Sequence, residues 1–294
     1  MKPSDICLAL LVVLIWGFNF VVIKLGLQGL PPILFTALRL LFAALPLVFF
    51  LRRPAVPWRL LAGYAAFQFA IQFSLLFCGM KLGFPPGLAS LAIQLQAFFT
   101  IGLAVAVLGE RPSKTQIAGA AVAFSGMALV ASQLDARATL LGFMLVIAAA
   151  FSWGIGNIFT KRMGKVDVLA LVAWGSLLAA PPLLLVSLLL IEGPSAVTSA
   201  IAQLNWMSIG AVLFQAYPTT VLGFGIWSLL MRKYPVATVA PFSLLVPVAG
   251  MFSAALVLGE ALPWWKMMAG ALVMCGLALN QFGPRFAARF SFAK

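Results

Sequence analysis

Apolar residues run along this chain in long blocks that short polar breaks separate. Each block is about 20 residues long, the length that an α-helix needs to cross a hydrocarbon core about 30 Å thick. The pattern therefore predicts an all-α, polytopic membrane protein. It predicts ten transmembrane helices, near residues 6–25, 32–50, 59–80, 87–108, 115–134, 140–160, 169–190, 206–231, 236–258 and 265–282.

Two motifs occur once in each half of the chain: Trp16-Gly17 with Trp153-Gly154, and Gly109-Glu110 with Gly259-Glu260. These copies predict an internal duplication, with one repeat over residues 1–137 and a second over residues 138–294. Each repeat holds five predicted spans. Because five is odd, the second repeat enters the membrane in the opposite orientation. Inverted repeats of this kind are typical of secondary transporters with a site near the middle of the bilayer.

Composition and charge fix the expected orientation. Apolar residues make up 64% of the chain, charged residues 9%, and the net charge is +13. The basic residues follow the loops, and 14 of the 19 fall on the face that would carry both termini: Lys2, Arg52, Arg53, Arg59, Arg111, Lys114, Lys161, Arg162, Lys165, Arg232, Lys233, Arg285, Arg289 and Lys294. The positive-inside rule then predicts cytoplasmic termini. Charges spread over short loops indicate topology, so we expect no nucleic-acid partner.

Polar side chains near the middle of a span mark candidate ligand sites, because burying them in hydrocarbon is costly. They gather on the first, third, fourth, sixth, eighth and ninth spans. Our candidate substrate-binding residues on these spans are Trp16, Asn19, Gln72, Gln94, Trp153, Asn157, Tyr217, Thr220 and Ser243. The alternative for any one of them is a hydrogen bond to a neighbouring helix. Gln94 and Gln96 are two residues apart and do not share a helix face, so we expect at most one to touch substrate.

Arg39 is the one charge placed firmly inside a predicted span. We include it among the candidates because a guanidinium can hold a substrate carboxylate through two hydrogen bonds. The alternative is that Arg39 bonds backbone carbonyls or extends to the interface. Prolines within spans predict kinks. Pro241 and Pro247 flank Ser243, which makes the ninth span the best candidate for a broken helix.

Several classes of function lack the residues that they need. The chain has no histidine, and its acids fall in loops or at span ends: Asp5, Glu110, Asp135, Asp167, Glu192 and Glu260. Intramembrane metalloproteases need histidine ligands, and aspartyl proteases need two buried aspartates. The three cysteines form no CxxC pair. We therefore expect no enzyme, no catalytic residue, no metal and no cofactor. A proton-driven exporter of cationic drugs is also disfavoured, because no carboxylate lies at depth.

The motifs resemble the EamA domain of the drug/metabolite transporter superfamily. The first half carries Trp16-Gly17-x-Asn19-Phe20, Lys24, Pro31-Pro32, Arg39, Gly87-x-Ala89-Ser90-Leu91 and Gly109-Glu110, and the second repeats Trp153-Gly154, Asn157, Lys161, Pro241 and Gly259-Glu260. The chain is similar in particular to bacterial exporters of cysteine and O-acetylserine. The resemblance implies ten helices in an inner membrane and export of amino acids or related metabolites. The second half departs from the pattern, because Ser176 stands at the position of Arg39.

Three hypotheses follow from these observations. The first is an alternating-access exporter of small neutral or zwitterionic metabolites, most of all amino acids and their derivatives, in the bacterial inner membrane. Its partners would be a small-molecule substrate and the lipid bilayer. The second is a transporter of phosphorylated metabolites such as nucleotide sugars, which would need several cavity lysines or arginines. The third is a non-transporting membrane scaffold, which the polar residues at mid-span disfavour. The sequence leaves the cargo, the energy coupling and the oligomeric state open.

Overall fold

The computed structural model describes residues 1–134 and 139–291, and the described chain is helical without any strand. The α-helices are α1 (Pro3–Gly29), α2 (Pro32–Val48), α3 (Trp58–Tyr64), α4 (Gln72–Lys81), α5 (Pro86–Ala92), α6 (Gln96–Leu108), α7 (Lys114–Ser132), α8 (Leu140–Met163), α9 (Val168–Val186), α10 (Gly193–Ala202), α11 (Trp206–Phe214), α12 (Gly223–Lys233), α13 (Val236–Val239), α14 (Leu245–Leu258) and α15 (Trp264–Ser291). The all-helical prediction is confirmed across these residues.

Eight helical segments, of 19 to 28 residues, are long and apolar enough to cross a membrane. The shortest would reach about 28 Å at the helical rise per residue. α2 is apolar but shorter, with 17 residues. α15 runs over 28 residues and continues beyond the predicted end at residue 282. The predicted boundary between the repeats, at residues 137 and 138, lies outside the described residues, as do Asp135, Arg137 and Lys294.

Five of the segments, which are numbered here by the ten predicted spans, contain a turn that is not α-helical. π-helical turns interrupt the third and eighth segments at η1 (Ala65–Ile71) and η4 (Gln215–Leu222), and 3-10 turns interrupt the fourth and ninth at η2 (Ile93–Leu95) and η5 (Ala240–Leu244). The predicted break in the ninth segment is confirmed. η4 contains Pro218, one of the prolines within spans at which a kink was predicted, whereas the breaks at η1 and η2 were not predicted. The two π turns begin 150 residues apart, the same offset that separates Gly109 from Gly259. A fifth irregular turn, η3 (Ser187–Ile191), ends the seventh segment.

The repeated Gly-Glu pairs end equivalent helices in the same way. Gly109 and Gly259 both adopt the left-handed conformation after α6 and α14, with φ of 68° and 66°. The following glutamate N–H then bonds back to the helix, from Glu110 to Ala104 at 3.2 Å and from Glu260 to Ala254 at 3.3 Å. Glycine favours this cap because it has no Cβ to clash at positive φ.

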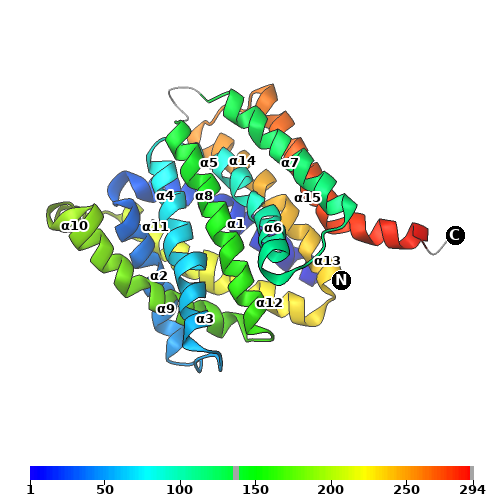
Figure 1. Cartoon of the computed structure of the whole chain (residues 1–294). Coiled ribbons are helices and arrows are strands. Elements are labelled where there is room, and N and C mark those ends of the chain that lie inside the picture. The colour runs from blue at the N-terminus through cyan, green and yellow to red at the C-terminus, as the bar shows by residue number, and fades with distance from the viewer. Residues whose placement is uncertain (135–138, 292–294) are drawn as a thin grey trace.

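Helices of the first half pack between helices of the second half, so the two halves form one bundle (Figure 1). α1 packs on α14 and α11 of the second half, and α8 packs on α6 and α4 of the first half. α2 packs on α9, and α7 lies along α15 on one edge of the bundle. Close approach depends on small residues. A Cβ on Gly17 would lie 2.5 Å from Ala249 Cβ, and a Cβ on Gly154 would lie 3.1 Å from Phe99 Cβ. Small residues allow such helix contacts in membranes.

One connection holds a helix that was not predicted. The predicted spans leave residues 191–205 as a connection, but α10 (Gly193–Ala202) lies there, and Figure 1 shows it at the edge of the bundle. Glu192 begins this connection and caps a helix of the other half. Its carboxylate accepts hydrogen bonds from the backbone N–H groups of Ile33 at 2.7 Å and Leu34 at 3.0 Å, at the start of α2. A carboxylate at a helix N-terminus is favourable because of the free N–H groups there.

Candidate functional site

Two candidate residues of α1 contact the π turn of the eighth segment. The indole Nε1 of Trp16 donates to the backbone oxygen of Thr219 at 3.0 Å, and its ring packs against Phe224 and Trp227. Asn19 is buried, and its Oδ1 accepts hydrogen bonds from Gln215 Nε2 and, at 3.1 Å, from Thr219 Oγ1. A π turn displaces carbonyls from the α-helical pattern, and such turns are frequent at functional sites.

Arg39 joins the same region from α2. Its guanidinium Nη2 donates to Thr220 Oγ1 at 3.1 Å, and Thr220 Oγ1 donates in turn to the backbone oxygen of Gln215 at 2.8 Å. The guanidinium carbon lies 3.9 Å from the centroid of the Phe73 ring. Arg39 is only 1% exposed. We call the buried set Asn19, Arg39, Gln215, Thr219 and Thr220 the Asn19–Arg39 network.

Buried polar atoms without a hydrogen-bond partner occur in this network and on the helical elements that pack on α2. Within the described residues there are eight such side-chain atoms: Arg39 Nε and Nη1, Gln68 Oε1, Gln72 Nε2 and Oε1, Ser74 Oγ, Ser176 Oγ and Gln215 Oε1. They lie on α2, η1, α4, α9 and η4. Folded proteins leave few buried polar groups unpaired, because each one costs about 1 to 3 kcal/mol. These atoms leave hydrogen-bonding capacity for water or a ligand.

A second set of polar residues connects the other pair of helices. Asn157 of α8 donates from Nδ2 to Gln96 Oε1 at 2.8 Å and to Thr100 Oγ1 at 3.0 Å, both on α6. Ser152 of α8 donates to the backbone oxygen of Phe67 in η1 at 2.7 Å. The two sets are alike, because in each the first helix of one half donates to a π-turn carbonyl of the other half.

The remaining candidates lie in different places. Gln94 is partly buried in η2, and its side chain makes no hydrogen bond among the described residues. Trp153 packs against the main apolar core. Ser243 Oγ donates to the backbone oxygen of Ala240 at 2.7 Å within η5. Tyr217 is 39% exposed and lines a surface cavity with Pro218 and residues of α12. The structure does not bring Tyr217 to the buried networks.

Gln215, Thr219, Gln96 and Thr100 complete the networks, and Ser176 is buried with an unpartnered hydroxyl, but all five are absent from the candidates. The sequence placed each of them inside a span, which was the available signal. Position in a span does not distinguish a residue that joins a network from one that does not. Ser176 lies on the seventh segment, which we did not expect to carry polar lining.

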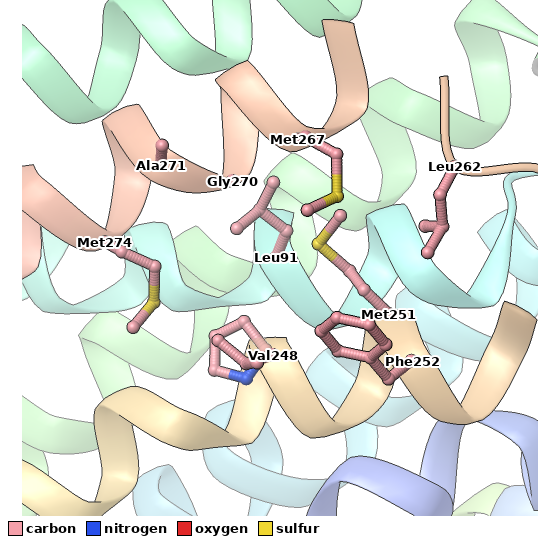
Figure 2. Close-up of a pocket in the computed structure, with 10 residues that line it drawn as sticks. Leu91, Val248, Met251, Phe252, Leu262, Met267, Gly270, Ala271 and Met274 are labelled. Atoms are coloured by element: carbon pink, nitrogen blue, oxygen red, sulfur yellow. The ribbon is translucent and has the colours of Figure 1, made fainter. Parts of the chain in front are cut away.

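The surface also has an apolar cavity of about 210 Å³ between α5, α14 and α15. Figure 2 shows Met251 and Met267 pointing toward each other across it. Apolar side chains and Gly270 line the cavity, and Phe252 at its edge is 48% exposed. Because the lining is almost entirely apolar, the cavity does not suit a charged or zwitterionic ligand. The buried networks are the better candidate site.

Charged pairs mark both ends of the bundle. Glu260 accepts a hydrogen bond from Gly87 N at 3.0 Å and pairs with Lys266 at 2.8 Å, and both side chains are nearly buried. Glu110 pairs with Lys161, but their side chains are 46% and 52% exposed. No group of three metal-binding side chains occurs within the described ranges. The polar side chains at depth are amides, hydroxyls and one guanidinium, which can bind a small polar molecule through hydrogen bonds.

A comparison with family models matches this chain twice. The description of the family is "EamA-like transporter family", and the matches cover residues 4–132 and 140–282. The chain belongs to this family. Its membership agrees with the resemblance that the motifs indicated, and it makes the protein a membrane transporter with several apolar helices.

Curated relatives extend this result. A protein of Salmonella typhimurium named "Probable amino-acid metabolite efflux pump" is 46% identical over 291 residues, covering 97% of both chains. A protein of Escherichia coli with the same name is 43% identical, also over 97% of both chains. A "Probable terminal-alkyne amino-acid exporter" of Streptantibioticus cattleyicolor is 28% identical over 95% of this chain and 94% of its own.

One solved structure matches the fold. It is a crystal structure with a TM-score of 0.66 and 19% sequence identity, and the match covers 98% of this chain and 99% of the other. At this identity the likeness concerns the fold alone.

Proposed function

We propose that this EamA-family protein exports amino acids and their small derivatives from the bacterial inner membrane by alternating access. The proposal includes ten membrane-spanning helices, cytoplasmic termini and two inverted repeats over residues 1–137 and 138–294. It rests on the relatives at 43 to 46% identity, which are named as amino-acid metabolite efflux pumps. Names of this kind also favour a transporter over an enzyme.

Matched irregularities support the inverted repeats. The π turns η1 and η4, the 3-10 turns η2 and η5, and the left-handed caps Gly109 and Gly259 all recur at an offset close to 150 residues. The packing is exchanged in the same way, since α1 contacts α14 and α11 while α8 contacts α6 and α4. Repeats of opposite orientation can exchange roles, and such an exchange opens one midplane site to either side in turn.

The pairing of the fourth and ninth segments supports a gate at one end. α5, the first half of the fourth segment, packs on α14. A Cβ on Gly250 of α14 would lie 2.5 Å from Ser90 of α5, and Glu260 holds Gly87 at the start of α5. α6, the other half of the fourth segment, has no packing of comparable extent with the described parts of α13 or η5. We infer that this structure is closed at the Glu260 end, which the charge bias places outside.

The single observation that carries the proposed site is a set of eight unpartnered polar atoms, three in the Asn19–Arg39 network and five on η1, α4 and α9, which pack on α2. We assign substrate contact to five residues: Trp16, Asn19, Arg39, Gln72 and Thr220. Four further candidates are assigned to the route that the substrate takes through the bundle: Gln94, Trp153, Asn157 and Ser243. Amides and hydroxyls suit a small zwitterion. A phosphorylated cargo is disfavoured, because Arg39 is the one buried cation without an acidic partner among the described residues.

Export from living cells tests the proposal. Cells that produce the protein should release more L-cysteine and O-acetyl-L-serine into the medium than cells with an empty vector. Intracellular levels of both compounds and the abundance of the protein in the membrane are measured in the same cultures. If the protein is abundant in the membrane and neither these nor other amino acids accumulate outside, the proposed function is wrong.

A further inference from the structure

Arg39 is a buried cation whose surroundings leave it without a counter-charge. Two of its three nitrogens, Nε and Nη1, are buried and have no hydrogen-bond partner, and the third donates to the neutral hydroxyl of Thr220. A buried ion is strongly unfavourable unless an opposite charge or several hydrogen bonds compensate it. The aromatic face of Phe73 compensates only in part.

The acids of this chain are engaged elsewhere. Asp5 pairs with Lys233, Glu110 with Lys161 and Glu260 with Lys266. The remaining two described acids cap helices: Asp167 accepts from Ala170 N at 2.9 Å, and Glu192 accepts from the start of α2. The sixth acid, Asp135, belongs to the connection between α7 and α8 and lies outside the described residues. No acid of the described residues therefore supplies a counter-charge to Arg39.

The network around Arg39 also offers an acceptor for a cation. Gln215 Oε1 is buried and unpartnered, while the Gln215 backbone oxygen accepts from Thr220, the residue that Arg39 contacts. Guanidinium N–H groups and an unpartnered amide oxygen thus lie in one bonded group. Such a pair complements a carboxylate and an ammonium carried by one small molecule. Phe73, which covers the guanidinium, is itself only partly buried, so a rotation of its ring would uncover Arg39.

We propose that Arg39 binds the carboxylate of the transported molecule, so that a free carboxylate is a requirement for the cargo. This inference rests on the proposed function and names the chemical group that the site selects. A carboxylate can accept two parallel hydrogen bonds from a guanidinium, and such bonds are shorter and stronger than those between neutral groups. Chloride or another inorganic ion would supply the same charge, and the experiment separates the two sources.

Competition in proteoliposomes tests the requirement without any mutation. Purified wild-type protein is reconstituted, and the flux of labelled L-cysteine is measured with unlabelled competitors. L-Cysteine and 3-mercaptopropionate, which keep the carboxylate, should compete, whereas L-cysteinamide should compete at least about tenfold more weakly, because it removes a charged hydrogen-bond acceptor. If L-cysteinamide competes as well as L-cysteine, the carboxylate requirement is wrong, although the transport function stands.

Variants place the requirement on Arg39. Arg39→Met should lose the preference for carboxylates, and Arg39→Lys should keep part of it. Arg59→Met is the control, because Arg59 is exposed at the start of α3 and its loss should not alter the preference. If Arg39→Met retains the wild-type preference, Arg39 is not the anchor. If Arg39→Met does not fold, the competition on the wild type still decides whether the cargo needs a carboxylate.

A failure of the proposed function would show itself differently, as the absence of any L-cysteine flux in the wild type. The anchor is then tested by thermal unfolding of the purified protein with sodium acetate, acetamide or sodium chloride at equal concentration. Acetate alone should raise the unfolding temperature of the wild type, and it should not raise that of Arg39→Met. Equal stabilisation by chloride and acetate would show that an inorganic anion fills the site and would overturn the proposal.

Discussion

Asn19 illustrates how a single polar residue organises two helices in this membrane protein. Its side-chain oxygen accepts two hydrogen bonds from the eighth segment, so α1 and η4 are joined at depth without any charge. Thr219 Oγ1 donates to this oxygen alone among the described residues, whereas Gln215 Nε2 also donates to the backbone oxygen of Asn19 at 3.4 Å. The residue is therefore expected to position the binding site as well as to contribute to it.

Replacing Asn19 tests this role. Asn19→Ala should reduce export strongly, because it removes an acceptor from buried donors in the network. Membrane abundance should stay near normal, because each buried donor left without an acceptor costs about 1 to 3 kcal/mol, which is small for a large helical bundle. Tyr217→Ala is the matched control and should resemble the wild type, since Tyr217 lies on the surface. Export and immunoblots of membranes are measured together. If abundance falls in step with export, Asn19 is a packing residue and the site is elsewhere.

At the scale of the elements, close helix contact depends on small residues and on caps. Gly17 is the clearest case, because an added Cβ would lie 2.5 Å from Ala249 Cβ and 2.8 Å from the backbone nitrogen of Gly250. Backbone atoms cannot rotate away, so α1 and α14 would have to separate. Interiors packed this closely tolerate little extra volume.

Gly17→Ala should consequently destabilise the protein by about 1 to 3 kcal/mol through overpacking. Gly102→Ala is the matched control, because no atom lies within 4 Å of its added Cβ and alanine favours a helix. Thermal unfolding in detergent is the measurement. A Gly17→Ala protein as stable as Gly102→Ala would contradict the contact between α1 and α14.

The two repeated glutamates should differ in their contribution to stability. Glu260→Gln keeps an acceptor for Gly87 N–H but leaves Lys266, whose side chain is 9% exposed, without a counter-charge. We expect it to lose about 1 to 3 kcal/mol. Glu110→Gln should lose less than about 1 kcal/mol, because its pair with Lys161 is half exposed and solvent screens it. Equal unfolding temperatures for the two variants would contradict the burial of the Glu260–Lys266 pair, and with it the closure of the bundle at that end.

The sequence predicted the helices well because their length and apolar content are a direct signal. It did not predict η1, since residues 65–71 contain no proline to announce a change of helix type. α10 was missed because its ten residues fall short of a span. For the site, the sequence identified Asn19 and Arg39 as polar residues at depth. It did not select Gln215, which bonds Asn19 in the structure, because a sequence does not say which helices pack together.

At the scale of the whole molecule, the account predicts the orientation in the membrane. The basic residues favour the face that holds the start of α1 and the end of α15, and these two ends lie on the same side in Figure 1. A cytoplasmically active reporter fused after Lys294 should therefore be active, and a reporter that needs the periplasm should be inactive there. The opposite pattern would reverse the orientation and with it the assignment of the Glu260 end to the outside.

Flux through the purified protein tests the central claim most directly. Wild-type protein is reconstituted in liposomes, and the movement of labelled L-cysteine and O-acetyl-L-serine down their gradients is compared with that in protein-free liposomes. UDP-glucose serves as a phosphorylated comparison. We predict saturable flux of at least one of the two amino-acid compounds and none of UDP-glucose. Amino-acid flux no faster than in protein-free liposomes, or flux of UDP-glucose alone, would contradict this account of the protein.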